Sequence, residues 1–380
     1  NWSCTMSVAI RALNWTLAMA AWWDDWSEDT RRRFWAVLFD HGRFIRDNLE
    51  WSPTDRYNHY FADVVGLAVV AAALVPHTTA VEWGVFASQE IQSEILGQFA
   101  PDGFHKEQST AYHRLMVELA SVGLRASEAI DRPFAPESRK RLAAAYRAMS
   151  LLQGDCEQMP LVGDNDSNTV LGVVARSDSD CRHLRCLGRQ LVPEADLPSG
   201  DSSPEALLVC GGSQRPANLD QGGRGDSPSG PCLPDSGFFI LGDSKNRMVL
   251  RCGPLTYRPI GAHRHLDQLS FTFWVAGLEL LCDPGQFCYT AWPDRGLQYR
   301  RSSSHNTVEL DGLLQSWAYC PQGGYAYTVF GDARPRCEHF EAGLNGATFV
   351  GAHSGYRRLR EGGDHRRSVR LDMASRTWEV

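Results

Sequence analysis

The stretch Gly237-Phe-Phe-Ile-Leu-Gly-Asp-Ser-Lys-Asn-Arg-Met-Val-Leu-Arg251 marks the point where the chain changes from helical to strand-forming patterns. Two short apolar runs, Phe238–Leu241 and Met248–Arg251, flank the turn residues Asp243-Ser-Lys-Asn. Apolar runs bounded by such turn residues are typical of paired strands. The stretch therefore predicts an antiparallel hairpin.

The same pattern continues beyond this hairpin. Leu269–Val275 and Glu279–Cys282 flank Ala276-Gly277, which is a tight-turn signal. Thr307–Leu310, followed by Asp311-Gly312, predicts another strand and turn. Strands at such short spacing predict an antiparallel β-sandwich.

Upstream of the hairpin, the sequence has helical character. Helical patterns occur over residues 30–48, 60–75, 107–130 and 137–153. The last of these follows Pro136, and proline is favoured as the first residue of a helix. Successive helices without intervening strands indicate a helical bundle or toroid. Helices first and strands second predict an α domain followed by a β domain.

The segment between the two halves has a different composition. Thr169–Val174 predicts a strand, whereas residues 193–236 are rich in Pro, Gly, Ser and Asp and indicate a linker or long surface loop. We therefore predict a helical domain over residues 1–160, a transition segment over 161–236 and an antiparallel β domain over 237–380.

The composition excludes several classes of protein. Of the 380 residues, 43% are hydrophobic, and the net charge is −7; this is typical of a globular protein and argues against a general nucleic-acid binder. The 11 cysteines are odd in number and form no paired Cys-x-x-Cys array, so neither a disulfide scaffold nor a zinc ribbon is indicated.

The sequence shows neither a membrane span nor a leader. The longest apolar run, Phe61–Val75, is interrupted by Asp63 and stopped by Pro76, so it predicts a buried helix that is too short to cross a bilayer. No signal peptide is recognisable, but the chain starts at Asn1 and not at Met. We expect a fragment that lacks both ends of the full protein.

Four polar clusters interrupt the apolar elements. They are Tyr57–Tyr60, Asp102–His113, Gly163–Ser167, and His263–Asp267 together with Asp283 and His305. Each has a purely structural explanation as well as a functional one. Asn58 could be only a helix N-cap, and Tyr112 could be an ordinary core aromatic. The third cluster is either a cation-binding loop or an Asx-turn.

The fourth cluster has the residue types of a metal site. If His263 and His265 lie on a strand, their side chains point to the same face. Asp283, at the end of the next predicted strand, and His305 complete a set of zinc-binding residues. The alternative is that these histidines are hydrogen-bonded loop residues without a metal.

Together, these motifs and their order resemble the heparinase II/III family of polysaccharide lyases. The resemblance covers nearly the whole chain and rests on Asn1–Ala12, Asn58-His-Tyr60, Gln108–Leu115, Gly163–Asp166, His263–Phe271, Asp283-Pro-Gly285 and Ser304–Val308. It implies an N-terminal α/α toroid, an antiparallel β-sandwich domain after it, and an active site between them.

The resemblance also implies roles for individual residues. It matches Asn58 to the residue that binds the uronate carboxylate, with His59 assisting, and it matches Tyr112 and His263 to the proton-transfer residues. The implied ligands of one structural zinc ion are His265, Asp283 and His305. We further predict substrate contacts for Gln108, Arg264 and Asp164. Either Tyr112 or His263 can be the base, with the other as the acid.

The predicted reaction is β-elimination on an anionic, uronic-acid-containing polysaccharide, without an organic cofactor. Heparan sulfate, alginate and other bacterial uronans are all compatible substrates, and glycan substrates favour the periplasm or cell envelope. One rival function is a glycoside hydrolase on a similar toroid, with two carboxylates from among Glu107, Asp164 and Asp166. The other is a non-catalytic glycan-binding protein of the cell envelope.

Overall fold

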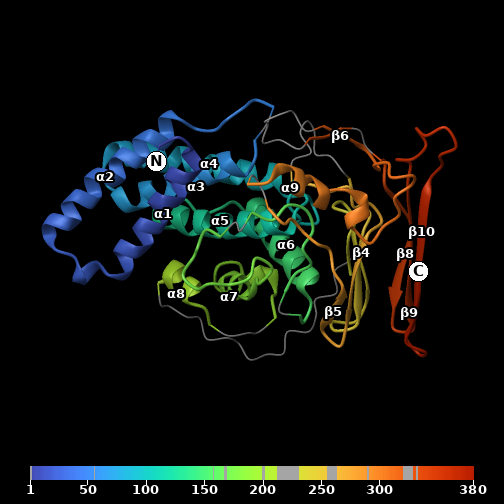
Figure 1. Cartoon of the computed structure of the whole chain (residues 1–380). Coiled ribbons are helices and arrows are strands. Elements are labelled where there is room, and N and C mark those ends of the chain that lie inside the picture. Colours follow the sequence, from blue (N-terminus) through green and yellow to red (C-terminus); the bar gives the residue numbers. More distant parts are fainter. Residues whose placement is uncertain are drawn as a thin grey trace.

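Helices form the first half of the chain and antiparallel sheets form the second, as predicted (Figure 1). The computed structural model describes residues 2–54, 56–156, 158–166, 169–198, 202–211, 231–254, 263–288, 291–319, 328–330 and 333–380. The main helices are α1 (Thr5–Ala21), α2 (Glu28–Asp47), α3 (Asn58–Leu74), α4 (Thr78–Gln98), α5 (Thr110–Ala129) and α6 (Pro136–Gln153). Shorter helices are α7 (Arg182–Leu191), α8 (Pro204–Cys210) and α9 (Pro293–Tyr299).

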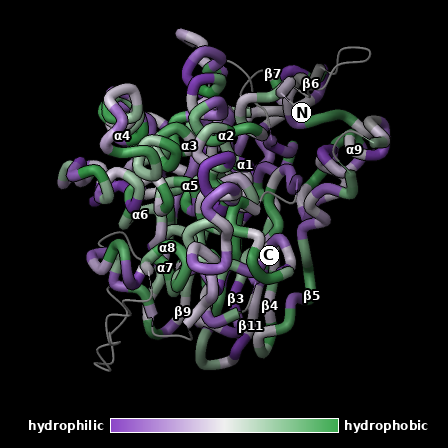
Figure 2. The backbone as a smooth tube through the Cα atoms, turned by 90° about the vertical axis from the view of Figure 1, so that its left-hand side faces the viewer, coloured by the Kyte–Doolittle hydropathy of each residue, from purple (hydrophilic) through white to green (hydrophobic). Residues whose placement is uncertain are grey.

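Helix α3 lies at the centre of the helical half. Every residue from Tyr60 to Ala71 is buried, and the helix packs against α1, α2, α4 and α5. Figure 2 shows hydrophobic residues gathered around α3 and α5. Gly66 lets α1 approach closely, because a Cβ atom there would lie 2.5 Å from the Cβ of Ala9. The predicted buried helix is confirmed, and within the described residues no helix has the length and apolar character needed to cross a membrane.

The described residues of the second half form two larger sheets and one small one, all antiparallel. The first sheet has the order β1 (Cys232–Leu233), β2 (Phe238–Gly242), β3 (Arg247–Arg251), β4 (Phe271–Val275) and β5 (Leu278–Leu281). The second has the order β11 (Thr377–Glu379), β10 (His365–Asp372), β9 (Gly346–His353) and β8 (Arg336–Gly343). The small sheet pairs β6 (Trp317–Tyr319) with β7 (Thr328–Phe330). Both predicted hairpins, β2–β3 and β4–β5, are confirmed.

The first sheet lies between the helical half and the second sheet (Figure 1). Along β2, Phe239 and Leu241 belong to the core shared with Phe349 of the second sheet, whereas Phe238 and Ile240 belong to the helical core. Successive strand residues point to opposite faces, so a strand buried on both faces has a continuous apolar run. This explains the sequence of β2, and it joins the two halves through common cores.

Two predicted strands are wrong. Thr169–Val174 forms turns and bends, and Val173 is 46% exposed. Thr307–Leu310 is also irregular, with only an isolated bridge between Leu310 and Leu313. Both segments contain β-branched residues, but neither has an adjacent strand to pair with in the described part of the chain. Strand propensity alone does not make a strand without such a partner.

The middle of the chain is more helical than predicted. Within residues 193–236, predicted as a linker, α8 begins after Ser203, whose side chain accepts a hydrogen bond from the N–H of Ala206. Residues 199–201 and 212–230 lie outside the described residues. Helix α7 was not predicted, although Leu184, Leu187 and Leu191 are buried at helical spacing.

His113 in α5 is a histidine that the fold keeps neutral. Its Nδ1 accepts a hydrogen bond from the backbone N–H of His105 at 3.2 Å, and its Nε2 donates to the carbonyl of Ala145 at 3.1 Å. Burial lowers the pKa of His113 to about 3. A proton added to Nδ1 would face the N–H of His105, so protonation would also break a hydrogen bond.

We expect the free energy of unfolding to fall as the pH is lowered from about 6.5 towards 3, because only the unfolded state binds a proton at His113 there. This group contributes up to about 1.4 kcal/mol per pH unit. In urea unfolding between about pH 7 and pH 4.5, His113→Gln should reduce the slope accordingly. The exposed His339→Gln control should keep the original slope. Equal slopes for all three proteins would contradict this expectation.

Candidate active site

The residues predicted to carry the chemistry meet where the helical half adjoins the first sheet. Asn58 begins α3, Tyr112 lies in the first turn of α5, and His263 lies in the connection from β3 to β4. The rings of Tyr112 and His263 stack, with centroids 3.8 Å apart and an interplanar angle of 21°. Tyr112 is 4% exposed. The structure therefore places the predicted proton-transfer residues in direct contact.

Glu107 connects Asn58 to His263. Its carboxylate oxygens accept hydrogen bonds from the side-chain amide of Asn58 at 3.1 and 2.9 Å, and Oε1 also accepts from the Asn58 backbone N–H at 3.1 Å. Nε2 of His263 lies 3.5 Å from Oε2 of Glu107. Because Glu107 is buried, these contacts fix the orientation of the Asn58 amide.

A close backbone crossing at Gly163 sets the spacing of the site. Gly163 has φ +75°, and a Cβ atom there would lie 2.6 Å from the carbonyl oxygen of His263 and 2.9 Å from Cβ of Ser109. Ser109 caps α5 by accepting from the N–H of Tyr112 at 3.2 Å, and its hydroxyl donates to the carbonyl of Asp164 at 2.6 Å. A glycine is therefore required where these three segments meet.

The buried carboxylate of Asp164 accepts hydrogen bonds from two histidine rings and one guanidinium group. It accepts hydrogen bonds from Nδ1 of His263 at 3.1 Å, from Nε2 of His265 at 3.0 Å and from Nε of Arg300 at 2.8 Å. Burial by itself would raise the pKa of Asp164, but the two histidine hydrogen bonds and the charge of Arg300 hold it well below its usual value. The predicted substrate residue Asp164 thus lies behind His263 and orients its ring.

His263 and His265 do not lie on a strand, so the prediction that their side chains share one face is wrong. His263 has φ +67°, which is incompatible with an extended strand, and its carbonyl accepts from the N–H of Asp164. The two rings instead bond different oxygens of the same carboxylate. Strained backbone of this kind is often found at active sites.

The three predicted metal ligands are brought together and buried. One ligand atom from each of His265, Asp283 and His305 lies within 4.8 Å of the others. Each histidine bonds a carboxylate through one ring nitrogen: His265 bonds Asp164, and His305 bonds Asp283 at 2.7 Å. The other nitrogens, Nδ1 of His265 and Nε2 of His305, are buried without a hydrogen-bond partner in the described residues. Metal-binding histidines commonly show this arrangement, so the set fits a metal ion.

The structure places the other predicted site residues, His59, Gln108 and Arg264, in two different locations. His59 follows Asn58 on α3, but its side chain is 49% exposed and its Nδ1 bonds Glu50. Gln108 and Arg264 line a cavity of about 430 Å³ between the end of α4 and the β half, together with Lys106. The guanidinium of Arg264 donates to the carbonyl of Lys106 at 2.7 Å. This cavity supplies polar and basic side chains beside Glu107.

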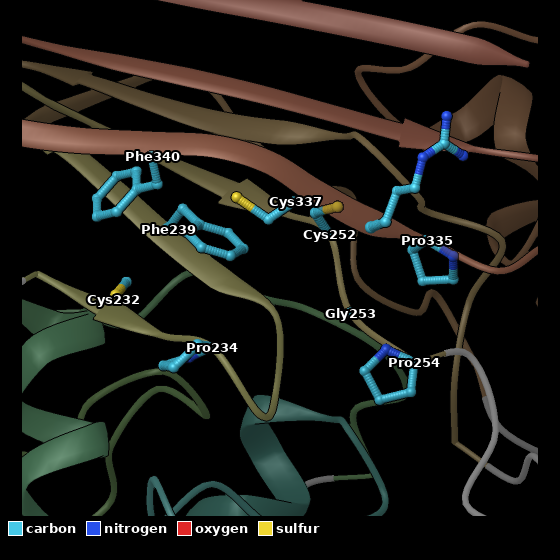
Figure 3. A pocket seen from close by; sticks show the side chains of 10 residues that line it. Cys232, Pro234, Phe239, Cys252, Gly253, Pro254, Pro335, Cys337 and Phe340 are labelled. Carbon is cyan, nitrogen blue, oxygen red and sulfur yellow. The ribbon is translucent and has the colours of Figure 1, made fainter. Parts of the chain in front are cut away.

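A second cavity, of about 480 Å³, lies between the two sheets (Figure 3). Its lining includes Cys232, Phe239, Cys252, Cys337 and Phe340. Burial raises the pKa of Cys252 to about 12, so its thiol stays protonated at neutral pH. This cavity therefore lacks the acid–base residues that meet at Tyr112.

Sequence reasoning did not identify two important contacts. Glu107 was predicted only as a possible hydrolase carboxylate, and its bonds to Asn58 span 49 positions. Arg300, which bonds Asp164 across 136 positions, lies in an arginine-rich stretch with no distinguishing signal.

Comparisons with known proteins give two matching family models and several solved structures of similar fold. The family model described as Heparinase II/III N-terminus matches residues 6–173, and Heparinase II/III-like, C-terminal matches residues 226–380. The crystal structure of a heparinase III is similar with a TM-score of 0.69 and 16% identity, over 96% of this chain and 53% of that one. Heparan sulfate lyase HepC from Pedobacter heparinus is similar with a TM-score of 0.63 and 16% identity, over 97% and 52%. The chain thus spans about half the length of these relatives, and no curated protein matches it.

Proposed function

Because the chain belongs to the heparinase II/III family, we propose that it is part of a polysaccharide lyase that cleaves uronic-acid-containing glycans by β-elimination. The observation that carries the proposal is the stacking of Tyr112 on His263 beside Asn58. These side chains come from both halves of the chain and meet at one place. Such a junction suits the binding of a long polymer.

The elimination needs three functions at the uronate. A base removes the C5 proton, which is weakly acidic because it lies next to the carboxylate carbon. An acid protonates the glycosidic oxygen that leaves C4, and a double bond forms between C4 and C5. The carboxylate takes up negative charge as the proton leaves, so a hydrogen-bond donor that faces it stabilises the transition state. A proton acceptor and a proton donor within hydrogen-bond reach complete the site.

We assign the two proton transfers to Tyr112 and His263. Asp164 holds Nδ1 of His263, so this ring presents Nε2 towards Glu107 and the Asn58 side. The face of the uronate that carries the C5 proton decides whether Tyr112 or His263 is the base. The position of the two rings in one stack lets a single bound sugar reach both.

We assign recognition of the substrate to the surrounding polar residues. Glu107 holds the Asn58 amide so that it can donate to the uronate carboxylate. Nδ1 of His59 contacts Glu50, so we assign the assisting role of His59 to its Nε2 atom. Gln108 and Arg264 contact an anionic polysaccharide from the neighbouring cavity. Polysaccharide substrates of this kind place the protein in the periplasm or cell envelope.

Product analysis tests the reaction type. Incubation with a panel of uronans should give products without added water and with a new C4–C5 double bond, seen by mass and by ultraviolet absorbance. Heparan sulfate and alginate belong in the panel because they differ in sulfation and in linkage. Saturated products that carry one added water would instead establish the glycoside hydrolase alternative.

We propose that His265, Asp283 and His305 hold one zinc ion with a structural role. The ion would fix the loop that carries His263 through the shared carboxylate of Asp164. We expect His305→Ala to lower the zinc content of dialysed protein by about one ion per chain, and to lower the midpoint of thermal unfolding. Elemental analysis and calorimetry measure the two effects. An unchanged zinc content would show that these histidines are only hydrogen-bonded loop residues.

A further inference from the structure

The described part of the chain contains a second group of three potential metal ligands, away from His265. Cys4 directly precedes α1, Glu50 lies in the connection between α2 and α3, and His59 lies in the first turn of α3. One ligand atom from each lies within 4.8 Å of the others. No role in the proposed elimination is assigned to Cys4 or Glu50.

The spacing of these atoms suits a tetrahedral metal. Sγ of Cys4 lies 3.4 Å from Oε1 of Glu50. Typical zinc–sulfur and zinc–oxygen bonds at a tetrahedral angle place the two ligand atoms about 3.5–3.6 Å apart. Nδ1 of His59 contacts the other oxygen of Glu50. A cation could therefore enter with small side-chain movements.

Glu50 is already held in the orientation that a ligand needs. Its Oε1 accepts hydrogen bonds from the backbone N–H groups of Thr5 at 2.8 Å and Met6 at 3.2 Å. Metal-binding carboxylates are commonly supported by such donors. The side chain of His59 is 49% exposed, which leaves a path for an ion from solvent.

We propose that Cys4, Glu50 and His59 form a second metal site that binds a thiophilic divalent cation such as Zn²⁺, with water completing the coordination. Binding releases the thiol proton of Cys4 to solvent and takes His59 as the neutral tautomer with its proton on Nε2, because thiolate and neutral imidazole are the binding forms. The ion joins the start of α1, the α2–α3 connection and the first turn of α3. It would thereby fix the backbone next to Asn58.

Cobalt binding tests this proposal separately from the zinc site at His265. A thiolate bound to Co²⁺ gives a near-ultraviolet charge-transfer band, and the set of His265, Asp283 and His305 contains no thiol. We expect the band in the original protein and its loss in Cys4→Ser. Cys4 is the N-cap of α1 without a side-chain cap bond, and serine is a favoured N-cap, so the substitution should preserve the fold.

A matched control removes a thiol elsewhere. Cys337→Ser replaces an exposed cysteine on β8 and should keep both the band and its intensity. Cobalt affinity at the thiolate site should fall by more than roughly 100-fold in Cys4→Ser, since loss of a supporting outer residue alone costs roughly 10–100-fold. Absence of the band in the original protein, or its persistence in Cys4→Ser, would overturn the proposal. Neither result depends on lyase activity.

Discussion

Replacement of Tyr112 by Phe is expected to slow turnover by roughly 10²–10⁴-fold, the usual effect of losing one proton-transfer group. The substitution removes only a hydroxyl, and the aromatic ring can still stack on His263. The free energy of unfolding should therefore change little. Initial rates of unsaturated product formation, compared with urea unfolding of the same preparation, measure both quantities.

Tyr146→Phe is the matched control for this experiment. Tyr146 is also buried, and its hydroxyl bonds Ser121 at 2.5 Å within the helical core, so its loss should affect stability more than turnover. If Tyr112→Phe turned over its substrate at the normal rate, Tyr112 would be a core aromatic and not part of the mechanism. The proposed pairing with His263 would then have no chemical meaning.

Asp164→Asn is expected to lower the free energy of unfolding by about 3–5 kcal/mol, because removing one partner leaves a buried charge uncompensated. The guanidinium of Arg300, with 8% of its side chain exposed, would lose its opposite charge. The shape of the residue is kept, so packing does not explain the loss. Turnover should also fall, because an amide at position 164 has only one accepting oxygen and can no longer accept from both histidine rings and Arg300.

Asp166→Asn provides the comparison, because Asp166 is exposed and close in sequence. Urea unfolding of both variants at neutral pH gives the two free energies of unfolding. Their difference separates the general effect of removing a negative charge from the effect of removing the buried partner of Arg300. Equal stability of the two variants would show that Asp164 is not the anion that holds this region together.

Local sequence patterns predicted the elements that carry strong turn or burial signals. The β2–β3 hairpin follows from its turn residues, and α3 follows from its long apolar run, which only Asp63 interrupts. The strands predicted at Thr169–Val174 and Thr307–Leu310 are not formed. A strand needs a neighbouring strand to pair with, and the sequence of one segment does not show whether such a neighbour exists. Helix α7 was missed although its leucines carry the helical spacing.

The candidate site was predicted from its motifs and their order, and the structure brings Asn58, Tyr112 and His263 together. The contacts that orient them could not be predicted in the same way. The bond from Arg300 to Asp164 joins segments that are 136 positions apart, so no local pattern predicts it. His263 and His265 were expected on one face, but a positive φ at His263 places them on two oxygens of one carboxylate.

The crossing at Gly163 has an evolutionary consequence. Contact between main-chain atoms and one small side chain sets the distance between the segments of Ser109, Asp164 and His263. The side chains that fill the two cores do not set this distance. Core residues can therefore be exchanged during divergence without moving Tyr112 relative to His263. The same geometry makes position 163 intolerant of substitution, because any side chain there would displace the segments of Ser109 and His263 together.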